Sequence, residues 1–470
     1  MSTTDDALTS ADGPALPGGL ALTDDPGLAD DPGLADDPVL TDNPGLADDP
    51  VLTDGPTLDD AFALADDLAE LRRALHREPE LGLFLPRTQR KVLDALAGLP
   101  LEITTGERLS SVTAVLRGGR PGPAVLLRAD MDALPVTEDT GLPYASTVPG
   151  VMHACGHDLH TAGLVGAARL LAARREELAG DVVLMFQPGE EGDGGAGIMI
   201  EEGVLDAAGR RVAAAYGLHV FSTQLPLGVA ATRAGTFLAA SDAFDAVVTG
   251  RGGHGSMPHL TRDPLVAACE MVTALQTRIA REIDVNDPAV ITVGALHAGD
   301  ARNVVPGRAE FRATVRTYSE AGRVAAQALV ERTLKGIALA HGVEVDVDYR
   351  RQYPPTVNSA REAAFALETA RELFGPHAAV EAPTPVSGSE DFSFLLERVP
   401  GAFVGIGACP PGTDPATAPV NHSPQAVFDD AVLPAQAALL ARLATGALAR
   451  YADGPGDGSS VRSPAAGRAA

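Results

Sequence analysis

The segment MHACGHDLHT, residues 152–161, concentrates side chains that bind metal ions. Cys155 and His157 are separated by one glycine, and His153 and His160 lie close by in the sequence. A thiolate and an imidazole together suit zinc-like metals, and the glycine permits a backbone turn that brings both to one ion. A buried cysteine beside surface histidines would have the same sequence, so this segment alone leaves both interpretations open.

A second candidate is the segment LMFQPGEEGDGGA, residues 184–196. An apolar run, predicted to be a strand, ends in a Pro-Gly turn that delivers the adjacent carboxylates Glu190 and Glu191. Ligands bind at the carboxyl ends of strands in open α/β sheets, and two neighbouring carboxylates there would repel each other unless a cation lies beside them. A solvated pair of loop charges is the alternative, but the position after a strand favours a site.

Two isolated histidines extend the set. His219 ends the apolar run AAAYGLHVF, residues 213–221, and His422 lies in the polar turn PVNHSP, residues 419–424. A single histidine in either setting is more often structural than a ligand. The combined donors, however, are enough for two metal ions with one carboxylate left over: Cys155, His157, Glu190 or Glu191, His219 and His422.

The elements that must position these residues follow an α/β pattern. Helical spacing over residues 61–98 is interrupted near its prolines, and short apolar runs at 111–118, 124–130 and 181–187 indicate strands. A helix is predicted over 160–178, between the last two strands. Strands separated by crossover helices predict a mixed, mostly parallel sheet.

The pattern changes between about 238 and 345, where longer alternating strands and two amphipathic helices follow the order β-α-β-β-α-β. That order is the ferredoxin-like split motif. The α/β pattern returns afterwards, which predicts an inserted α+β domain. The expected boundaries are catalytic parts at 59–237 and 348–452 and an insertion at 238–347.

Both ends of the chain are predicted to be disordered, over 1–58 and 453–470. Residues 22–57 repeat an acidic hexapeptide of the type LADDPG, and a proline every six residues forbids a continuous helix. The repeat lacks the glycine and glutamate of an EF-hand loop, which favours a solvated acidic tail over a calcium site.

Composition excludes several classes of protein. The 470 residues carry a formal net charge of −27, of which the first 71 residues contribute 18 carboxylates and no cation. This charge argues against nucleic-acid binding. Three cysteines do not make a disulfide framework, and the sequence shows neither a signal peptide nor an apolar stretch that predicts a membrane span. We expect a cytoplasmic protein without a membrane partner.

The order of motifs resembles the M20 metallopeptidase family, in particular its amidohydrolase branch of hippurate, N-acyl-amino-acid and auxin-conjugate hydrolases. The resemblance covers about residues 60–450 and rests on nine segments: RALHREPELG (73–82), LRADMDALP (127–135), MHACGHDLHTA, FQPGEEG, YGLHV, GRGGHGSMPH (250–259), NVVPG (303–307), GSEDF (388–392) and NHSP. It implies a zinc-peptidase-like catalytic domain with an inserted lid or dimerisation domain.

The resemblance also implies roles for individual residues. The ligands of a dinuclear centre would be Cys155, His157, Glu191, His219 and His422, with Cys155 shared by two divalent ions. Manganese or zinc is expected, and cobalt or nickel is allowed. Glu190 would be the general base for a metal-activated water. Asp130 would orient the metal site, and Asp158 would lie behind His157.

In the inserted domain, the resemblance implies that His254 reaches the partner subunit's active site in a homodimer. It implies that Asn303 and Arg316 together hold the carboxylate of the substrate, although Arg316 could also be a surface strand residue. Gly388 belongs to a loop that would line the substrate pocket.

The function that follows is hydrolysis of the amide bond of an N-acyl amino acid to a carboxylic acid and an amino acid. A dipeptidase or carboxypeptidase with the same mechanism is one alternative. A catalytically silent binding or scaffold protein is an alternative of another class, and the complete set of candidate ligands argues against it. A zinc nucleobase deaminase is disfavoured because the PCxxC element is missing.

Overall fold

The computed structural model describes residues 56–452. The tail predicted at 1–58 therefore lies outside the described residues except for 56–58, and the tail predicted at 453–470 lies wholly outside them. The first helix, α1 (Leu58–Phe62), has the acidic residues Asp59 and Asp60 in its first turn. Thr57 caps it: the Thr57 hydroxyl accepts from the Asp60 amide at 3.2 Å, and the Asp60 carboxylate accepts from the Thr57 amide at 2.9 Å. This reciprocal capping explains why the helix starts there.

An eight-stranded mixed sheet forms the centre of the larger body, in the order β1-β2-β4-β3-β5-β16-β6-β15. The central strands β4, β3, β5 and β16 are parallel neighbours, whereas β1 and β2 are antiparallel at one edge. The strands are β1 (Leu101–Thr105), β2 (Val112–Leu116), β3 (Arg120–Asp130), β4 (Ala179–Gln187), β5 (Ala214–Phe221), β6 (Ala230–Thr232), β15 (Ala379–Glu381) and β16 (Gly401–Gly407). The predicted mixed, mostly parallel α/β class is confirmed.

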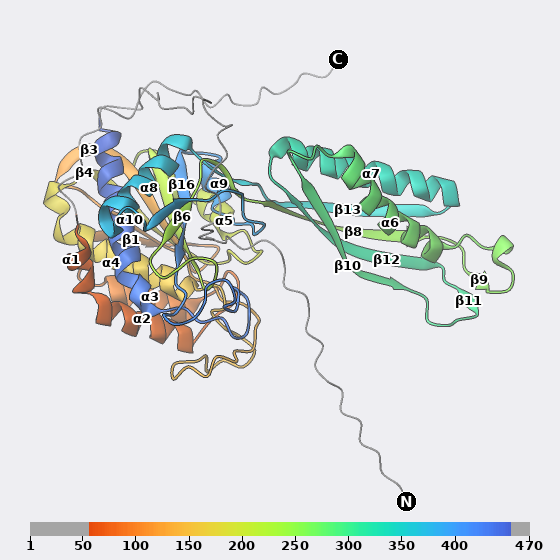
Figure 1. Cartoon of the computed structure of the whole chain (residues 1–470), viewed down its shortest axis with the longest axis horizontal. Helices are drawn as coiled ribbons and strands as arrows, with labels where there is room; N and C mark the ends of the chain where they lie inside the picture. Colours follow the sequence, from red (N-terminus) through yellow and green to blue (C-terminus); the bar gives the residue numbers. More distant parts are fainter. Residues whose placement is uncertain (1–55, 453–470) are drawn as a thin grey trace, which may run out of the picture.

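Helices cover both faces of this sheet (Figure 1). One apolar core lies under five helices: α2 (Ala65–Arg77), α3 (Pro86–Leu96), α4 (His157–Ala173), α8 (Ala360–Phe374) and α10 (Leu433–Arg450). A smaller core on the other face lies under α5 (Gly195–Glu201) and α9 (Ser393–Leu396). The segment Asp430–Arg450, which contains α10, is long and apolar enough to cross a membrane by length and composition, but 83% of its most apolar window is buried. It is therefore a core helix of this body.

The inserted part forms a separate lobe with its own apolar core (Figure 1). Its antiparallel sheet has the order β10-β12-β8-β13, and α6 and α7 pack on one face of it. The elements are β8 (Ala240–Thr249), α6 (Pro264–Glu282), β10 (Ala289–Ala298), β12 (Arg308–Thr317), α7 (Glu320–His341) and β13 (Glu344–Tyr353). This is the β-α-β-β-α-β order predicted from the sequence.

Two small ribbons complete the topology. Strand β9 (Gly253–His254) pairs with β11 (Val304–Val305) at the end of the lobe farthest from the α/β body (Figure 1). Strand β7 (Gly235–Leu238) pairs with β14 (Thr356–Asn358), and this pair brackets the two chain crossings between the bodies. Strand β13 continues past the boundary expected at 347. The sequence pattern does not reveal this last part of the strand, because Arg350 and Arg351 break the apolar alternation.

A buried ion pair fastens α2 to the start of α4. The Arg72 Nε donates to Asp158 Oδ2 at 2.8 Å, and His76 Nδ1 lies 2.7 Å from the same oxygen. Burial would raise the pKa of Asp158, but Arg72 and His76 hold it well below its ordinary value. The hypothesis that Asp158 supports His157 is wrong, because the Asp158 carboxylate points to α2.

We expect Arg72→Met to lower the free energy of unfolding by about 3–5 kcal/mol, because removing one member of a buried pair leaves the other charge uncompensated. Arg73→Met is the matched control: Arg73 is the next residue, its side chain is 46% exposed, and the loss of its ion pair with Asp430 should cost at most about 1 kcal/mol. Urea unfolding of the two variants measures the difference. Equal losses would contradict the prediction.

Candidate metal centre and active site

The candidate ligands come together at the carboxyl edge of the parallel strands, where α/β sheets bind ligands. Strand β4 runs into the loop that carries Glu190 and Glu191, β5 carries His219, and His157 is the first residue of α4. His422 arrives from a loop far along the chain, and its amide donates to the Ala154 carbonyl at 2.8 Å.

Cys155 lies in the middle of the cluster. Its Sγ is 3.4 Å from His219 Nε2 and 3.3 Å from His422 Nε2, and the latter atom is 3.2 Å from Glu191 Oε1. Donor atoms of two trios lie within 4.8 Å of one another: Cys155, His157 and His219, and Cys155, Glu191 and His422. Because the thiol belongs to both trios, the arrangement has the form expected of a ligand shared by two ions.

The surroundings of the two ring nitrogens of His157 show whether the candidate ligands fit metal ions. The side chain is fully buried, and neither ring nitrogen has a hydrogen-bond partner. A buried polar atom without a partner is costly, and a coordination bond would satisfy one of these two nitrogens. Thiolate, imidazole and carboxylate donors suit divalent transition ions. The residues present therefore fit a two-metal site.

Backbone geometry around the site depends on two unusual residues. Gly156 has φ +87°, and a Cβ there would lie 2.4 Å from Val220 Cγ2, so only glycine permits the turn between Cys155 and His157. His422 has φ +73°, which is uncommon for a residue with a side chain. Asn421 holds that loop by donating to the Cys155 carbonyl at 3.2 Å and to the Val220 carbonyl at 3.0 Å.

The Asp132 carboxylate holds the backbone of the loop that carries Glu190. The backbone amides of Glu190 and Glu191 each donate to one oxygen of the Asp132 carboxylate, both at 3.0 Å. The Glu190 side chain is 6% exposed. Burial, followed by the negative charges of Glu390 and Glu191, raises the pKa of Glu190 well above its ordinary value. A raised pKa is what a carboxylate needs to accept a proton in catalysis near neutral pH.

Asp130 belongs to a buried network behind the ligands. Its Oδ1 lies 2.5 Å from His160 Nδ1, and its Oδ2 accepts from Arg128 at 2.6 Å and lies 3.6 Å from His157 Nε2. Arg128 also donates to Glu390 at 2.8 Å and to Asp391 at 2.9 Å. Asp130 thus lies where a residue that orients His157 would lie.

A cavity of about 510 Å³ opens over this cluster. Cys155, Glu190, Glu191, His219 and His422 line one side of it, and Gly388 lies in its wall. The inserted lobe supplies the opposite side through Ser241, Arg316, Gln352 and Tyr353. The Arg316 Nη1 is buried without a hydrogen-bond partner, and burial lowers the pKa of this guanidinium. A guanidinium that lines a cavity and has a buried nitrogen without a hydrogen-bond partner suits an anionic ligand.

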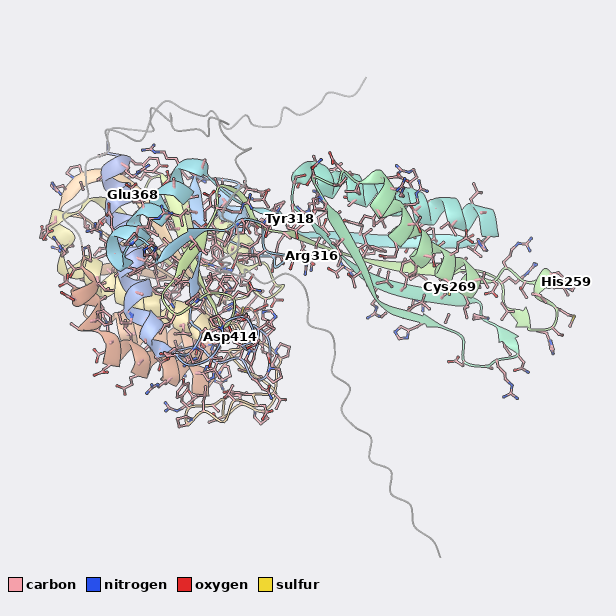
Figure 2. All side chains as sticks on the ribbon, viewed as in Figure 1. His259, Cys269, Arg316, Tyr318, Glu368 and Asp414 are labelled. Carbon is pink, nitrogen blue, oxygen red and sulfur yellow. The ribbon has the colours of Figure 1, made fainter. Side chains whose placement is uncertain are left out.

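His254 and Asn303 are not brought to this cavity within one chain. They lie together on the β9–β11 ribbon, where the Asn303 carbonyl accepts from the Gly255 amide at 2.8 Å. Arg316 lies at the junction with the α/β body, whereas His259, beside the ribbon, lies at the far end of the lobe (Figure 2). The two ends of β12 (Arg308–Thr317) are about 30 Å apart at the usual rise per residue. Within one chain, Asn303 and Arg316 therefore lie far apart, and their joint binding of a carboxylate stays a prediction.

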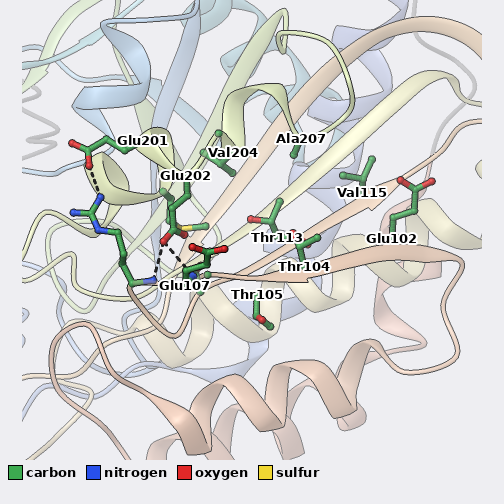
Figure 3. Close-up of a pocket in the computed structure, with 15 residues that line it drawn as sticks. Glu102, Thr104, Thr105, Glu107, Thr113, Val115, Glu201, Glu202, Val204 and Ala207 are labelled. Carbon is green, nitrogen blue, oxygen red and sulfur yellow. Dashed lines mark hydrogen bonds and ion pairs between the residues drawn. The ribbon is translucent and has the colours of Figure 1, made fainter.

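A second cavity, of about 580 Å³, lies between the edge strands β1 and β2 and helix α5 (Figure 3). Threonines and glutamates line it, and its lining has neither an imidazole nor a thiol. Of these two cavities, the first is the one lined by the candidate metal ligands.

The sequence prediction missed Arg128, Asp132, Tyr353 and Asn421. A signal existed for the first two, because an arginine inside an apolar strand must find carboxylates when it is buried, and Asp132 follows directly after the end of that strand. Tyr353 and Asn421 act through contacts with backbone atoms of other segments, which leave no sequence pattern.

Comparisons with known proteins identify the family of the chain. The model of Peptidase family M20/M25/M40 matches residues 126–446. "IAA-amino acid hydrolase ILR1-like 2" of Arabidopsis thaliana is 39% identical over 383 residues, 81% of this chain and 84% of that protein. "Thermostable carboxypeptidase 1" of Saccharolobus solfataricus is 38% identical over 348 residues, 73% of this chain and 86% of that protein.

A solved structure, the Bacillus subtilis YXEP protein, described as a dinuclear metal-binding peptidase of the M20 family, superposes with a TM-score of 0.71. It is 34% identical, and the match covers 82% of this chain and 99% of that one. The chain is a metal-dependent hydrolase of the amidohydrolase type. It belongs to the peptidase family M20/M25/M40.

Proposed function

We propose that the chain hydrolyses the amide bond of N-acyl amino acids, releasing a carboxylic acid and a free amino acid. The observation that carries this proposal is the Arg316 guanidinium, whose Nη1 is buried without a hydrogen-bond partner, in the same cavity as Glu190 and the candidate ligands. A substrate with a free carboxylate next to its amide would satisfy the guanidinium and place the amide carbonyl over the cluster.

The mechanism assigns each step to residues of the chain. Divalent ions held by Cys155, His157, Glu191, His219 and His422 would supply Lewis acidity and lower the pKa of a water. Glu190 accepts the proton from the attacking water and transfers it to the leaving amine. Its carboxylate must stay uncoordinated, because a bound lone pair cannot take the proton. Arg316 holds the substrate carboxylate and so fixes the scissile carbonyl.

Manganese or zinc is our proposal for the ions, with cobalt or nickel as further candidates. The thiolate and imidazoles favour zinc, and the carboxylate admits manganese. The cytoplasmic location stays a prediction that rests on the sparse cysteines of the sequence.

A panel of matched substrates tests the function. Each N-acetyl, N-benzoyl or longer N-acyl amino acid would be compared with its C-terminal carboxamide, together with dipeptides, on enzyme loaded with one metal at a time. We expect turnover of the free acids at least about tenfold above the carboxamides, as expected for the loss of one charge-assisted contact. Equal turnover of both forms would refute the proposal. Preferential cleavage of dipeptides would instead support the carboxypeptidase alternative, which one relative's name also suggests.

We further propose that the protein acts as a homodimer in which the β9–β11 ribbon of one copy completes the cavity of the other. His254 lies on this ribbon and Asn303 directly precedes β11, and the ribbon and the segment after β9 expose apolar residues: Met257 is 43% exposed, Leu260 57% and Val304 54%. Exposed apolar groups at the tip of a lobe are typical of an interface.

Coexpression of two inactive variants tests the dimer. In hybrids of Glu190→Gln and His254→Ala, one of the two sites has both native residues, so roughly a quarter of all sites should be active after random pairing. Hybrids of Glu190→Gln and Arg316→Ala are the control, because both residues serve the cavity of their own chain and no site is restored. Activity of the first mixture no higher than that of the control would exclude the shared site.

A further inference from the structure

Tyr353 connects the inserted lobe to the loop of the general base. It is the last residue of β13, at the point where the chain returns from the lobe to the α/β body. Its hydroxyl donates to the Glu190 carbonyl at 2.8 Å and accepts from the Gly194 amide at 3.0 Å. The residue is 6% exposed, and its ring packs edge-on against Phe394, with ring centres 5.8 Å apart.

The loop that Tyr353 holds is rich in glycine. Gly189, Gly192 and Gly194 have φ values of +73°, +101° and +67°, so the segment has few side chains that could pack and hold it. Asp132 fixes the two amide groups of Glu190 and Glu191. On the carbonyl side of Glu190, the contacts are the Gly192 amide, which belongs to the same loop, and the Tyr353 hydroxyl. Tyr353 is therefore the side chain that ties this carbonyl to another part of the molecule.

Arg316, Ser241 and Tyr353 lie side by side on three neighbouring strands of the lobe and form one row across its sheet. Ser241 of β8 pairs with Arg316 of β12 on one side and with Tyr353 of β13 on the other. Residues directly opposite in antiparallel strands point to the same face, and all three line the cavity. Neighbouring strands are about 4.8 Å apart, so the outer two residues of the row lie about 10 Å apart across one rigid sheet. A bulge between Arg351 and Tyr353 aims the tyrosine at the body.

We infer that Tyr353 is a positioning residue that holds the Glu190 loop at a fixed separation from Arg316, and that this row selects substrates by the distance between carboxylate and amide. The inference rests on the proposed function, in which Arg316 binds the substrate carboxylate. A sheet row of constant width favours one spacing between carboxylate and amide, and in the proposed substrates this spacing is one carbon. An N-acyl-β-amino acid, one carbon longer, would place its carbonyl away from Glu190.

The test compares full-length, metal-loaded wild type with Tyr353→Phe. The substitution keeps the ring and removes both hydrogen bonds. We expect kcat for N-acylglycine to fall at least about tenfold with KM within about twofold, because placing the general base does not alter carboxylate binding. The preference for N-acylglycine over N-acyl-β-alanine should shrink, while metal content and melting temperature stay unchanged. Tyr349→Phe is the matched control: Tyr349 lies on the same strand, and its hydroxyl donates to Asp242 at 3.1 Å within the lobe.

Hydrogen–deuterium exchange supplies a readout that needs no substrate. Peptides that cover residues 188–196 should exchange faster in Tyr353→Phe than in wild type, and the rest of the chain should not change. Unchanged exchange together with unchanged kcat and unchanged preference would overturn the inference, as would a rise in KM alone. If wild type cleaves no N-acyl amino acid, the proposed function fails, and the exchange experiment still decides whether Tyr353 holds the loop.

Discussion

Glu190→Gln is expected to lower kcat by about 10²–10⁴-fold, the range attributed to a positioned general base. The amide cannot accept the proton of the attacking water, yet it has nearly the shape of the carboxylate. The loop itself should stay in place, because Asp132 and Tyr353 hold it through backbone atoms. Steady-state kinetics on the best N-acyl amino acid of the panel measures the loss.

Measuring the bound metal distinguishes loss of the general base from disruption of the metal site. Two ions per chain should remain in Glu190→Gln, since the residue is not among the proposed ligands, whereas Cys155→Ala should lose metal because the thiol belongs to both trios. A Glu190→Gln enzyme that keeps more than about a tenth of its activity would show that another group is the base, given the range expected for general-base catalysis. Loss of metal in this variant would show that Glu190 is a ligand.

Arg316→Ala is expected to lower kcat/KM for N-acyl amino acids by about 10–100-fold, because a hydrogen bond to a charged group contributes about 1.5–3 kcal/mol. The carboxamide of the same substrate should be affected little, since it offers no charge for the guanidinium. Arg316→Lys should recover only part of the loss, because an ammonium cannot form the two parallel bonds of the planar guanidinium.

Arg312→Ala is the control for Arg316. Both residues lie on β12 four positions apart, so they share a face of the strand, but the Arg312 side chain is 66% exposed and does not line the cavity. Kinetics equal to wild type are expected. If acids and carboxamides lose the same factor in Arg316→Ala, the residue supports the cavity wall and does not bind the carboxylate.

Much of the fold could be predicted from the sequence, because periodicity records which face of each element is buried. The apolar runs at 124–130 and 181–187 lie within β3 and β4, and the alternating strands of the insertion occur in the predicted order. The end of β13 could not be predicted, since Arg350 and Arg351 are bound by Asp245 and Glu320 across the lobe, and these contacts leave no local pattern.

Only part of the site could be predicted from the sequence. Soft donors at short spacing, such as Cys155 and His157, indicate a metal site from the sequence alone, and the structure brings them together with His219, His422 and Glu191. Residues that act through the backbone of distant segments could not be found in this way. Tyr353 is 163 positions from the carbonyl it binds, and nothing near it in the sequence points to a metal centre.

The late position of β16 and α10 in the chain has a consequence for biosynthesis. Strand β16 lies between β5 and β6, so the central sheet lacks a strand until residue 407 has been made, and α4 lacks the helix that packs on it, α10, until residue 450 has been made. At ordinary rates of translation, α4 waits on the order of tens of seconds for its covering helix. The inserted lobe, with a contiguous sequence and its own core, is complete well before then. The nascent chain therefore leaves the ribosome as a finished lobe attached to an unfinished body, whose apolar surfaces must be kept from aggregating until the last helix emerges.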